Sequence, residues 1–303
     1  MSTIEKALAK QKQVELENKE HSKESVNLKK ADKSLISAFE KQKTSTLGIK
    51  KQNIQTNKKE IITLNGDDLN NRGFIYSTDS VHHIQEEFRH IKRKLLNNAF
   101  GPAAKTLKHS NLIMVSSSTP NEGKTFISIN LALSIALEQD KTVLLIDADV
   151  LRPSLHRELH FESKQGLLEY LLNEVPLLSD VIYNTNIENL KLIPAGKPHR
   201  LTNELLASTR MVQLAEELAV RYPDRIVIFD CPPILGVTET PVLSSLVGQA
   251  IVVVEESKTK LADIKNAVAQ LDENIAIGFV MNKAIRSKKD GYGYYGYGYG
   301  KKN

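Results

Sequence analysis

The sequence predicts one α/β domain with a mainly parallel sheet and helices on both of its faces. Short apolar runs alternate along the chain with segments of helical periodicity, which is the order typical of parallel sheets. Several of these runs do not alternate apolar with polar residues, as expected of strands that helices cover on both sides. A chain of 303 residues is long enough for such a domain with flanking segments.

The composition divides the chain into four regions. Residues 1–43 are rich in Lys, Glu and Gln and are expected to form at most an exposed helix. Residues 44–76 are interpreted as a linker because Thr, Asn, Gln and Lys dominate them. Residues 77–289 hold the predicted domain. Residues 290–303 contain a run of Gly and Tyr that is expected to be disordered, because alternating glycine leaves the backbone too free for a packed element.

The expected elements follow one another in the third region. Strands are predicted at Leu112–Ser117, Val143–Asp147, Leu190–Pro194, Arg225–Asp230, Ala250–Glu255 and Ile275–Asn282. The helices between them include Lys124–Glu138, Met211–Tyr222 and Lys260–Asp272.

Charge and composition restrict the class of protein. Residues 1–60 hold 14 Lys, no Arg and 8 acidic residues, whereas the remainder holds 27 basic and 28 acidic residues, so no nucleic-acid partner is expected for the domain. The basic segment is interpreted as a solvated tail, with contact to anionic lipid or an acidic partner as the alternative. No apolar run approaches the ~18 residues of a membrane span, and Met1–Gln11 lacks the apolar core of a signal peptide. With Cys231 as the one cysteine, no internal disulfide forms, and a cytoplasmic protein is expected.

The segment Leu112–Thr125 reads LIMVSSSTPNEGKT, an apolar strand followed by Gly-Lys-Thr at a helix start. This is the context of a phosphate-binding loop, although Ser118 replaces the first glycine of G-x-x-x-x-G-K-[ST]. Backbone N–H groups and the helix dipole would bind the phosphates of ATP, Lys124 would reach the β- and γ-phosphates, and Thr125 would bind Mg²⁺. A helix start without a ligand is the alternative. The expected ATP-binding residues are Ser118, Thr119, Pro120, Asn121, Glu122, Gly123, Lys124, Thr125 and Phe126.

Carboxylates follow two further strands. Asp147 and Asp149 lie two apart at the end of VLLID, so both are expected on one side of the chain, and Arg152 could stabilise phosphate charge. Asp230 ends IVIFD, in the position of a Walker B acid. Thr125, Asp147, Asp149 and Asp230 are the candidate Mg²⁺ ligands, and one of the first two aspartates could accept a hydroxyl proton. Cys231 is interpreted as a packed residue rather than a nucleophile.

Three blocks in this order, SSTPNEGKT, LLIDADVLRPSLH and IVIFDCPP, precede a tyrosine cluster and resemble the bacterial protein-tyrosine kinases. The resemblance covers roughly Asp79–Asn303. It implies a P-loop NTPase-like fold, ATP and Mg²⁺ as cofactors, and a non-specific protein-tyrosine kinase whose catalytic residues are Lys124, Asp147, Asp149 and Arg152. It also implies that Asn282, at the end of the last strand, contacts the adenine. The alternative is that Asn282 is only a turn residue at the strand end.

The resemblance extends to EEFRHIK, where the family carries E-x-x-R-x-x-R on a helix that assembles subunits into a ring. Glu86, Arg89 and Lys92 are therefore candidate oligomerisation residues of a homo-oligomer, with Lys in place of the last Arg. A solvated, charged helix is the alternative.

The stretches EEFRHIKRKLLNNAFG and MSTIEKALAK look like those of the autokinases encoded with exosortase-linked exopolysaccharide systems. This resemblance implies an activating membrane partner of the chain-length-determinant (polysaccharide copolymerase) type, location at the inner membrane through that partner, and a cognate tyrosine phosphatase. It implies autophosphorylation in trans, which would disperse the ring and regulate exopolysaccharide polymerisation, export and chain length. The acceptors would be Tyr292, Tyr294, Tyr295, Tyr297 and Tyr299.

Two other functions stay open. An ATPase of the partitioning or division-site-positioning class shares this fold, but such proteins usually carry Lys where this chain has Thr119. A non-catalytic scaffold with an adhesive Gly-Tyr segment is disfavoured by the complete set of Lys124, Thr125 and three aspartates.

Overall fold

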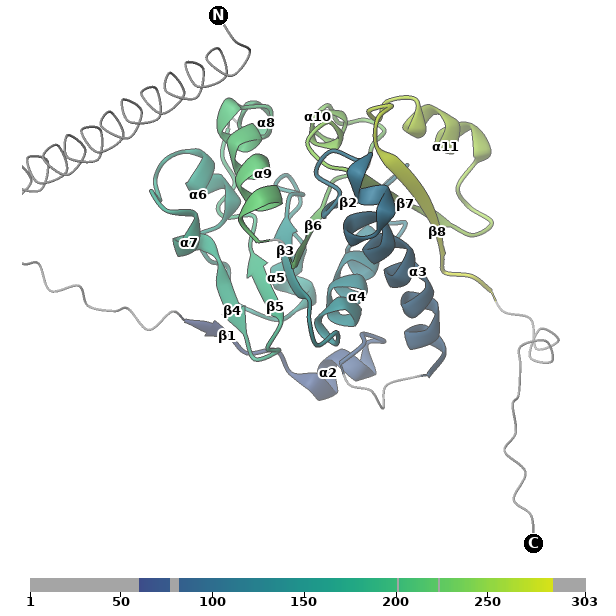
Figure 1. The fold of residues 1–303 in the computed structure, drawn as a ribbon, viewed down its shortest axis with the longest axis horizontal. Helices are drawn as coiled ribbons and strands as arrows, with labels where there is room; N and C mark the ends of the chain where they lie inside the picture. The colour runs from purple at the N-terminus through teal and green to yellow at the C-terminus, as the bar shows by residue number, and fades with distance from the viewer. Residues whose placement is uncertain (1–59, 77–81, 201, 223, 286–303) are drawn as a thin grey trace, which may run out of the picture. The chain divides into compact units, whose positions relative to one another are not determined.

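The computed structural model describes residues 60–76, 82–200, 202–222 and 224–285. Within them, eight strands form one sheet in the order β1-β4-β5-β3-β6-β2-β7-β8 (Figure 1). All neighbouring pairs are parallel except β4 and β5, which form an antiparallel pair. The strands are β1 (Ile61–Ile62), β2 (Leu112–Ser117), β3 (Thr142–Asp147), β4 (Tyr183–Thr185), β5 (Leu190–Ile193), β6 (Arg225–Asp230), β7 (Gln249–Glu255) and β8 (Ala276–Asn282).

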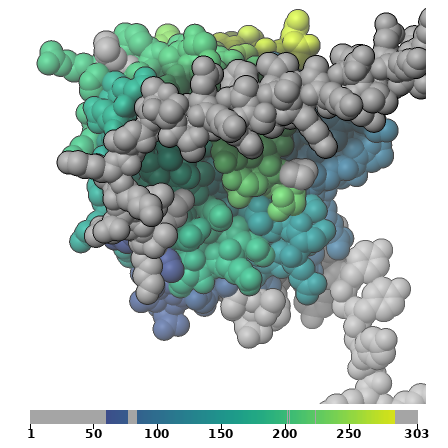
Figure 2. Space-filling model, turned by 60° about the vertical axis from the view of Figure 1, so that its left-hand side comes forward, coloured from purple at the N-terminus to yellow at the C-terminus, as the bar shows by residue number. Residues whose placement is uncertain are grey.

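The helices flank this sheet. The long ones are α3 (His82–Phe100), α4 (Lys124–Ala136), α9 (Thr209–Arg221) and α11 (Leu261–Val268). The shorter ones are α2 (Gly66–Asn71), the 3₁₀ helix η1 (Pro102–Lys105), α5 (Leu155–Glu158), α6 (Leu167–Leu171), α7 (Leu178–Val181), α8 (Thr202–Leu206) and α10 (Glu239–Ser244). Figure 2 turns the β1–β4 side of the sheet forward, where teal and green residues form most of the coloured surface.

Helices cover both faces of the sheet, because each central strand feeds two separate apolar clusters. On β2, Leu112 and Met114 belong to the cluster that includes residues of α6 to α11, whereas Ile113 and Val115 belong to the cluster that includes residues of α2 to α5. All four side chains are 0% exposed. The predicted fold class, a mainly parallel sheet with helices on both faces, is confirmed. No helix of the described residues is long and apolar enough to cross a membrane.

The segment before α3 corrects the predicted boundary of the domain. Residues 60–76 were expected to be part of a linker, yet they form β1 and α2. Leu64 and Leu69 are 2% and 1% exposed, and Phe74 packs on the ring of Phe126 with the centroids 5.2 Å apart. Asn65 caps α2 by accepting from the backbone N–H groups of Asp67 and Asp68. The folded unit therefore begins near residue 59 rather than at 77.

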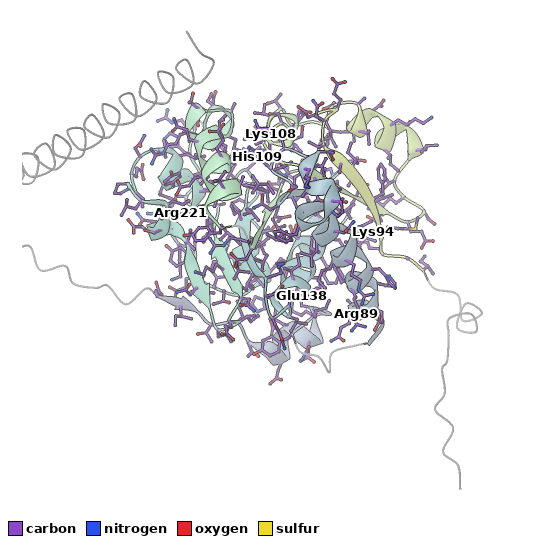
Figure 3. All side chains as sticks on the ribbon, in the orientation of Figure 1. Arg89, Lys94, Lys108, His109, Glu138 and Arg221 are labelled. Carbon is purple, nitrogen blue, oxygen red and sulfur yellow. The ribbon has the colours of Figure 1, made fainter. Side chains whose placement is uncertain are left out.

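Helix α3 contacts α4 through Lys92, one of the three residues expected to assemble subunits. Lys92 is 7% exposed, forms an ion pair with Glu138 and donates to the Ser134 carbonyl at 3.0 Å. Arg89 instead pairs with Glu86 on the exposed side of the same helix. Figure 3 labels Arg89 and Glu138. Lys92 is thus committed within its own chain, which corrects its predicted place on an oligomer surface. Glu86 and Arg89 keep that prediction.

The remaining predictions on the first 59 residues and on residues 286–303, including the five tail tyrosines, lie outside the described part of the chain.

Candidate active site

A loop between β2 and α4 forms the phosphate-binding element that the sequence predicts. The backbone of Asn121 and Gly123 is left-handed, with φ of 69° and 96°. A side chain at residue 123 would be strained in this conformation, and its Cβ would lie 2.0 Å from the amide nitrogen of Asn282. The loop therefore needs glycine at this position. It leads directly into α4, whose first residues are Lys124 and Thr125.

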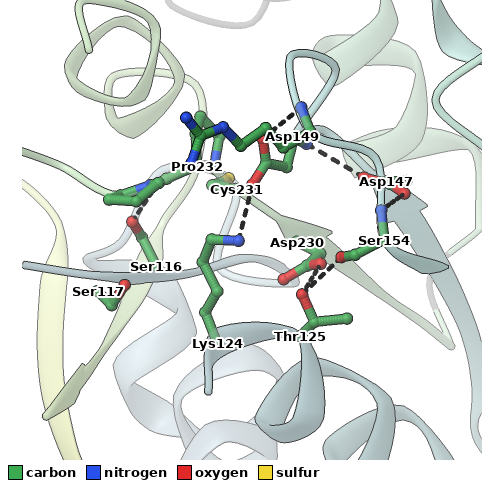
Figure 4. A network of polar contacts seen from close by, with 12 residues as sticks. Ser116, Ser117, Lys124, Thr125, Asp147, Asp149, Ser154, Asp230, Cys231 and Pro232 are labelled. Atoms are coloured by element: carbon green, nitrogen blue, oxygen red, sulfur yellow. Dashed lines mark hydrogen bonds and ion pairs between the residues drawn. The ribbon is translucent and has the colours of Figure 1, made fainter. Parts of the chain in front are cut away.

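Lys124 extends toward the end of β3. Its Nζ lies 2.7 Å from Oδ2 of Asp149, and both side chains are largely buried (Figure 4). Burial lowers the pKa of Lys124, but the carboxylates of Asp230 and Asp149 outweigh burial and raise this pKa above its ordinary value. Lys124 is therefore a fixed positive charge at the loop, as phosphate binding requires.

Thr125 joins the loop to the end of β6. Its hydroxyl donates to Oδ2 of Asp230 at 2.8 Å and lies 2.8 Å from the hydroxyl of Ser154. The other oxygen of Asp230 accepts from Ser128 at 2.9 Å. Burial raises the pKa of Asp230, and Lys124 and the two hydroxyl groups oppose this shift. Asp230 is 0% exposed, so these contacts fix the orientation of its carboxylate.

Asp147 organises the loop that follows β3. Its oxygens accept from the backbone N–H groups of Asp149, Ser154 and Leu155 at 3.1–3.2 Å. Burial, followed by the charge of Asp230, raises the pKa of Asp147. A buried carboxylate with three backbone donors holds the turn that carries Asp149 and Ser154.

A cavity of about 650 Å³ opens at this constellation. Of the three strand-end aspartates, Asp149 lines the cavity, whereas Asp147 and Asp230 lie behind its wall. Arg152 is exposed and lines the cavity without a side-chain partner among the described contacts. The rest of the lining comes from the phosphate-binding loop and the start of α4, from α5 and the loop before it, and from the turn after β6: Pro120, Asn121, Gly123, Lys124, Thr125, Phe126, Leu151, Ser154, Arg157, Glu158, Pro232, Pro233, Leu235, Gly236 and Val237.

The donor set fits Mg²⁺ held together with a nucleotide. Among the described residues, no three His, Cys, Asp or Glu side chains converge as a ready-made metal cage. Mg²⁺ is usually held by one or two carboxylates together with water and phosphate oxygens. The Thr125 hydroxyl and the Asp149 carboxylate line the cavity and supply such oxygen donors, and the Asp230 carboxylate lies directly behind Thr125, 2.8 Å from its hydroxyl.

Of three further residues predicted to bind ATP, only Phe126 lines the cavity. Asn282 does not line the cavity, and its amide nitrogen donates to the Glu122 carbonyl at 2.8 Å. Ser118 is buried, and its hydroxyl lacks a partner within the described structure. Phe126 lines the cavity, and its ring is backed by Phe74.

Sequence reasoning missed two hydroxyl residues of the site. Ser128 lies one helical turn after Lys124, and this spacing could have marked it as a partner of the Walker B acid. Ser154 follows Arg152 and Pro153 in a loop, and nothing in its sequence context signals the contact with Thr125.

Comparisons with known proteins agree with this geometry. A family model described as an AAA domain matches residues 110–281, more than half of the chain. Tyrosine-protein kinase YwqD of Bacillus subtilis (strain 168) is 32% identical over 228 residues, which are 74% of this chain and 92% of the relative. This chain belongs to the bacterial tyrosine-protein kinases. The putative tyrosine-protein kinase CapB of Staphylococcus aureus is 30% identical over 214 residues, 70% of this chain and 90% of the relative.

Solved structures of this kinase family show the same fold. The BceF tyrosine kinase domain has 30% sequence identity and a TM-score of 0.56, and the match covers 65% of this chain and 76% of that chain. The kinase domain of Escherichia coli tyrosine kinase ETK has 26% identity and a TM-score of 0.58, covering 80% and 95%. The predicted family, enzyme class and P-loop fold are thereby confirmed.

Some bacterial tyrosine-protein kinases are much longer than this chain. Tyrosine-protein kinase ptk of Acinetobacter johnsonii is 37% identical over 180 residues, which are 59% of this chain but 24% of the relative. The chain therefore spans about a quarter of such a relative and most of YwqD and CapB.

Proposed function

We propose that this chain is a MgATP-dependent protein-tyrosine autokinase that phosphorylates tyrosines of its own C-terminal segment, one subunit acting on another. One observation carries the proposal. Lys124, Thr125, Asp149 and Asp230 come from three separate segments and meet beside one cavity. A glycine-tyrosine run of residues 291–300 in the same chain supplies candidate acceptors.

The residues would act as follows. The loop amides and Lys124 would bind the phosphates. Thr125 would hold Mg²⁺ with the Asp230 carboxylate behind it, and the ion, when bound, would supply positive charge beside the phosphates. Asp149 is the better of the two candidates for accepting the phenol proton, because it lines the cavity while backbone donors occupy Asp147. A phenol has a pKa near 10, so a carboxylate acceptor favours its attack at neutral pH. Arg152, at the cavity edge, is placed to bind phosphate charge.

The finer assignments rest on resemblance. They are a homo-oligomer contacted through Glu86 and Arg89, an activating membrane protein of the chain-length-determinant type, a cognate phosphatase, and control of exopolysaccharide polymerisation, export and chain length. One relative, in Klebsiella pneumoniae, is named a putative tyrosine-protein kinase in the cps region, and it is 34% identical over 186 residues.

Mass spectrometry of the purified chain tests the kinase. After incubation with MgATP, we expect successive additions of about 80 Da, each one phosphoryl group, on peptides spanning residues 291–300. Lys124→Ala and Asp149→Ala should abolish them, and the partner's cytoplasmic segment is added in a parallel reaction. Hydrolysis of ATP without phosphotyrosine in either reaction would instead favour an ATPase of the positioning class.

A further inference from the structure

Two side chains from the end of β8 contact the carbonyl groups of the phosphate-binding loop. Nζ of Lys283 donates to the Asn121 carbonyl at 2.7 Å, and Nδ2 of Asn282 donates to the Glu122 carbonyl at 2.8 Å. Neither residue lines the cavity. Lys283 also pairs with Oε2 of Glu255 at 3.0 Å, so its ammonium group is held between β7 and the loop.

These contacts fix the direction in which the loop amides point. In a trans peptide unit the C=O of one residue and the N–H of the next point in opposite directions. Because the carbonyl of Asn121 points to Lys283, the N–H of Glu122 points away from it. The N–H of Gly123 likewise points away from Asn282. Asn121 and Gly123 line the cavity, and backbone N–H groups left free of protein partners are what a phosphate-binding loop offers its ligand.

A buried carboxylate completes this arrangement. Glu122 is 1% exposed, and its Oε2 accepts from the backbone N–H of Thr119 at 2.9 Å. Its Oε1 contacts the hydroxyl of Thr259, a residue between β7 and α11. The Thr259 oxygen itself accepts from the N–H of Glu255 at 2.9 Å, which leaves the hydroxyl proton for Glu122.

We propose that Thr259 and Lys283 are positioning residues for the nucleotide phosphates. They hold the loop, which has left-handed residues at 121 and 123, in the shape that presents its amides to the phosphates. Neither residue touches the nucleotide in this proposal. It rests on the proposed function, because it assumes that the cavity binds ATP.

Lys283→Met tests the proposal in the full chain, with Lys258→Met as the matched control. Lys258 pairs with the same Glu255, at 3.2 Å, but contacts no loop carbonyl. With a fluorescent ADP analogue and Mg²⁺, we expect Lys283→Met to weaken binding by about tenfold, the order of one hydrogen bond to a charged group. Lys283→Arg should retain most of the affinity, and Lys258→Met should bind as the wild type does. The thermal midpoints should stay alike, since the Lys283 side chain is 47% exposed.

Thr259 provides a second, independent pair of variants. Thr259→Val removes the hydroxyl at nearly constant volume, and we expect it to raise the KM for ATP with little change in kcat, whereas Thr259→Ser should restore the wild-type KM. Equal affinities for Lys283→Met and Lys258→Met would overturn the proposal, as would identical kinetics for the Thr259 pair. If the wild-type chain binds ADP but forms no phosphotyrosine, only the kinase proposal fails. Wild-type chain that binds no nucleotide would overturn both.

Discussion

Lys92 and Arg89 lie three residues apart on α3 but differ in what they contact. Lys92 is buried between Glu138 and the Ser134 carbonyl, while Arg89 forms an exposed pair with Glu86. Lys92→Ala should lower the free energy of unfolding by about 1–3 kcal/mol, because it leaves a buried carbonyl without its donor. Arg89→Ala should change it by less than about 0.5 kcal/mol. Urea unfolding measures both.

The same two variants separate stability from assembly. If Arg89 and Glu86 contact a neighbouring subunit, Arg89→Ala should shift the sedimentation of the protein toward smaller species. A loss of assembly in Lys92→Ala at unchanged unfolding free energy would contradict the inward role of Lys92.

Cys231 follows Asp230 directly, yet the structure makes it inert. The thiol is 0% exposed, and burial, followed by the negative charge of Asp230, raises its pKa well above 9.0. Because the thiolate is the reactive form, we expect no reaction of the native chain with Ellman's reagent from pH 7 to pH 9. One equivalent should react in denaturant. If the native chain reacted as fast as an exposed thiol, the turn after β6 would have to open readily.

At the scale of elements, the α2 segment is predicted to be part of the folded unit. Leu69, on α2, is 1% exposed, and Ile61, on β1, is 57% exposed. Leu69→Ala should lower the free energy of unfolding by about 2–5 kcal/mol, as for other buried leucines. Ile61→Ala is the matched control and should have a small effect. Small effects of both changes would contradict this prediction and indicate that residues 60–76 are a linker.

The elements show why the sequence predicts most strands of the sheet but misses β1 and β4, at one edge. Strands β2, β3, β6 and β7 each contain four or five consecutive apolar residues, so local pattern suffices to locate them. Strands β1 and β4 have two and three residues. Runs this short carry no periodicity, and they become strands only through their pairing partners in the folded sheet.

The same distinction applies to the residues of the site: those in local motifs are predictable, and those brought in by the fold are not. Lys124, Thr125, Asp149 and Asp230 are predictable because each lies at a strand end or helix start of a recognisable motif. Ser154 and Thr259 act on motif residues 29 and 137 positions away in the sequence. Only the folded sheet brings such pairs together, so local sequence carries no signal for them.

At the scale of the whole molecule, the direction of phosphoryl transfer between subunits is open to a mixing experiment. One chain carries Lys124→Ala and keeps its tyrosines, so it can accept but not transfer. The other keeps Lys124 and has Phe at positions 292, 294, 295, 297 and 299. If transfer occurs in trans, MgATP should place phosphate on the first chain only when the second is present, because the sole intact tyrosine segment and the sole intact active site then belong to different subunits.

The rate provides a second criterion. Transfer between subunits requires association, so the initial rate per active chain should rise with the concentration of the acceptor chain and then saturate. Adding Arg89→Ala to both chains should shift this dependence to higher concentration if α3 forms the subunit contact, with the rate at saturation retained. Wild-type chain that phosphorylates itself at a concentration-independent rate, beside an unphosphorylated Lys124→Ala chain, would instead establish transfer within one subunit. The glycine-tyrosine segment would then have to reach the cavity of its own chain.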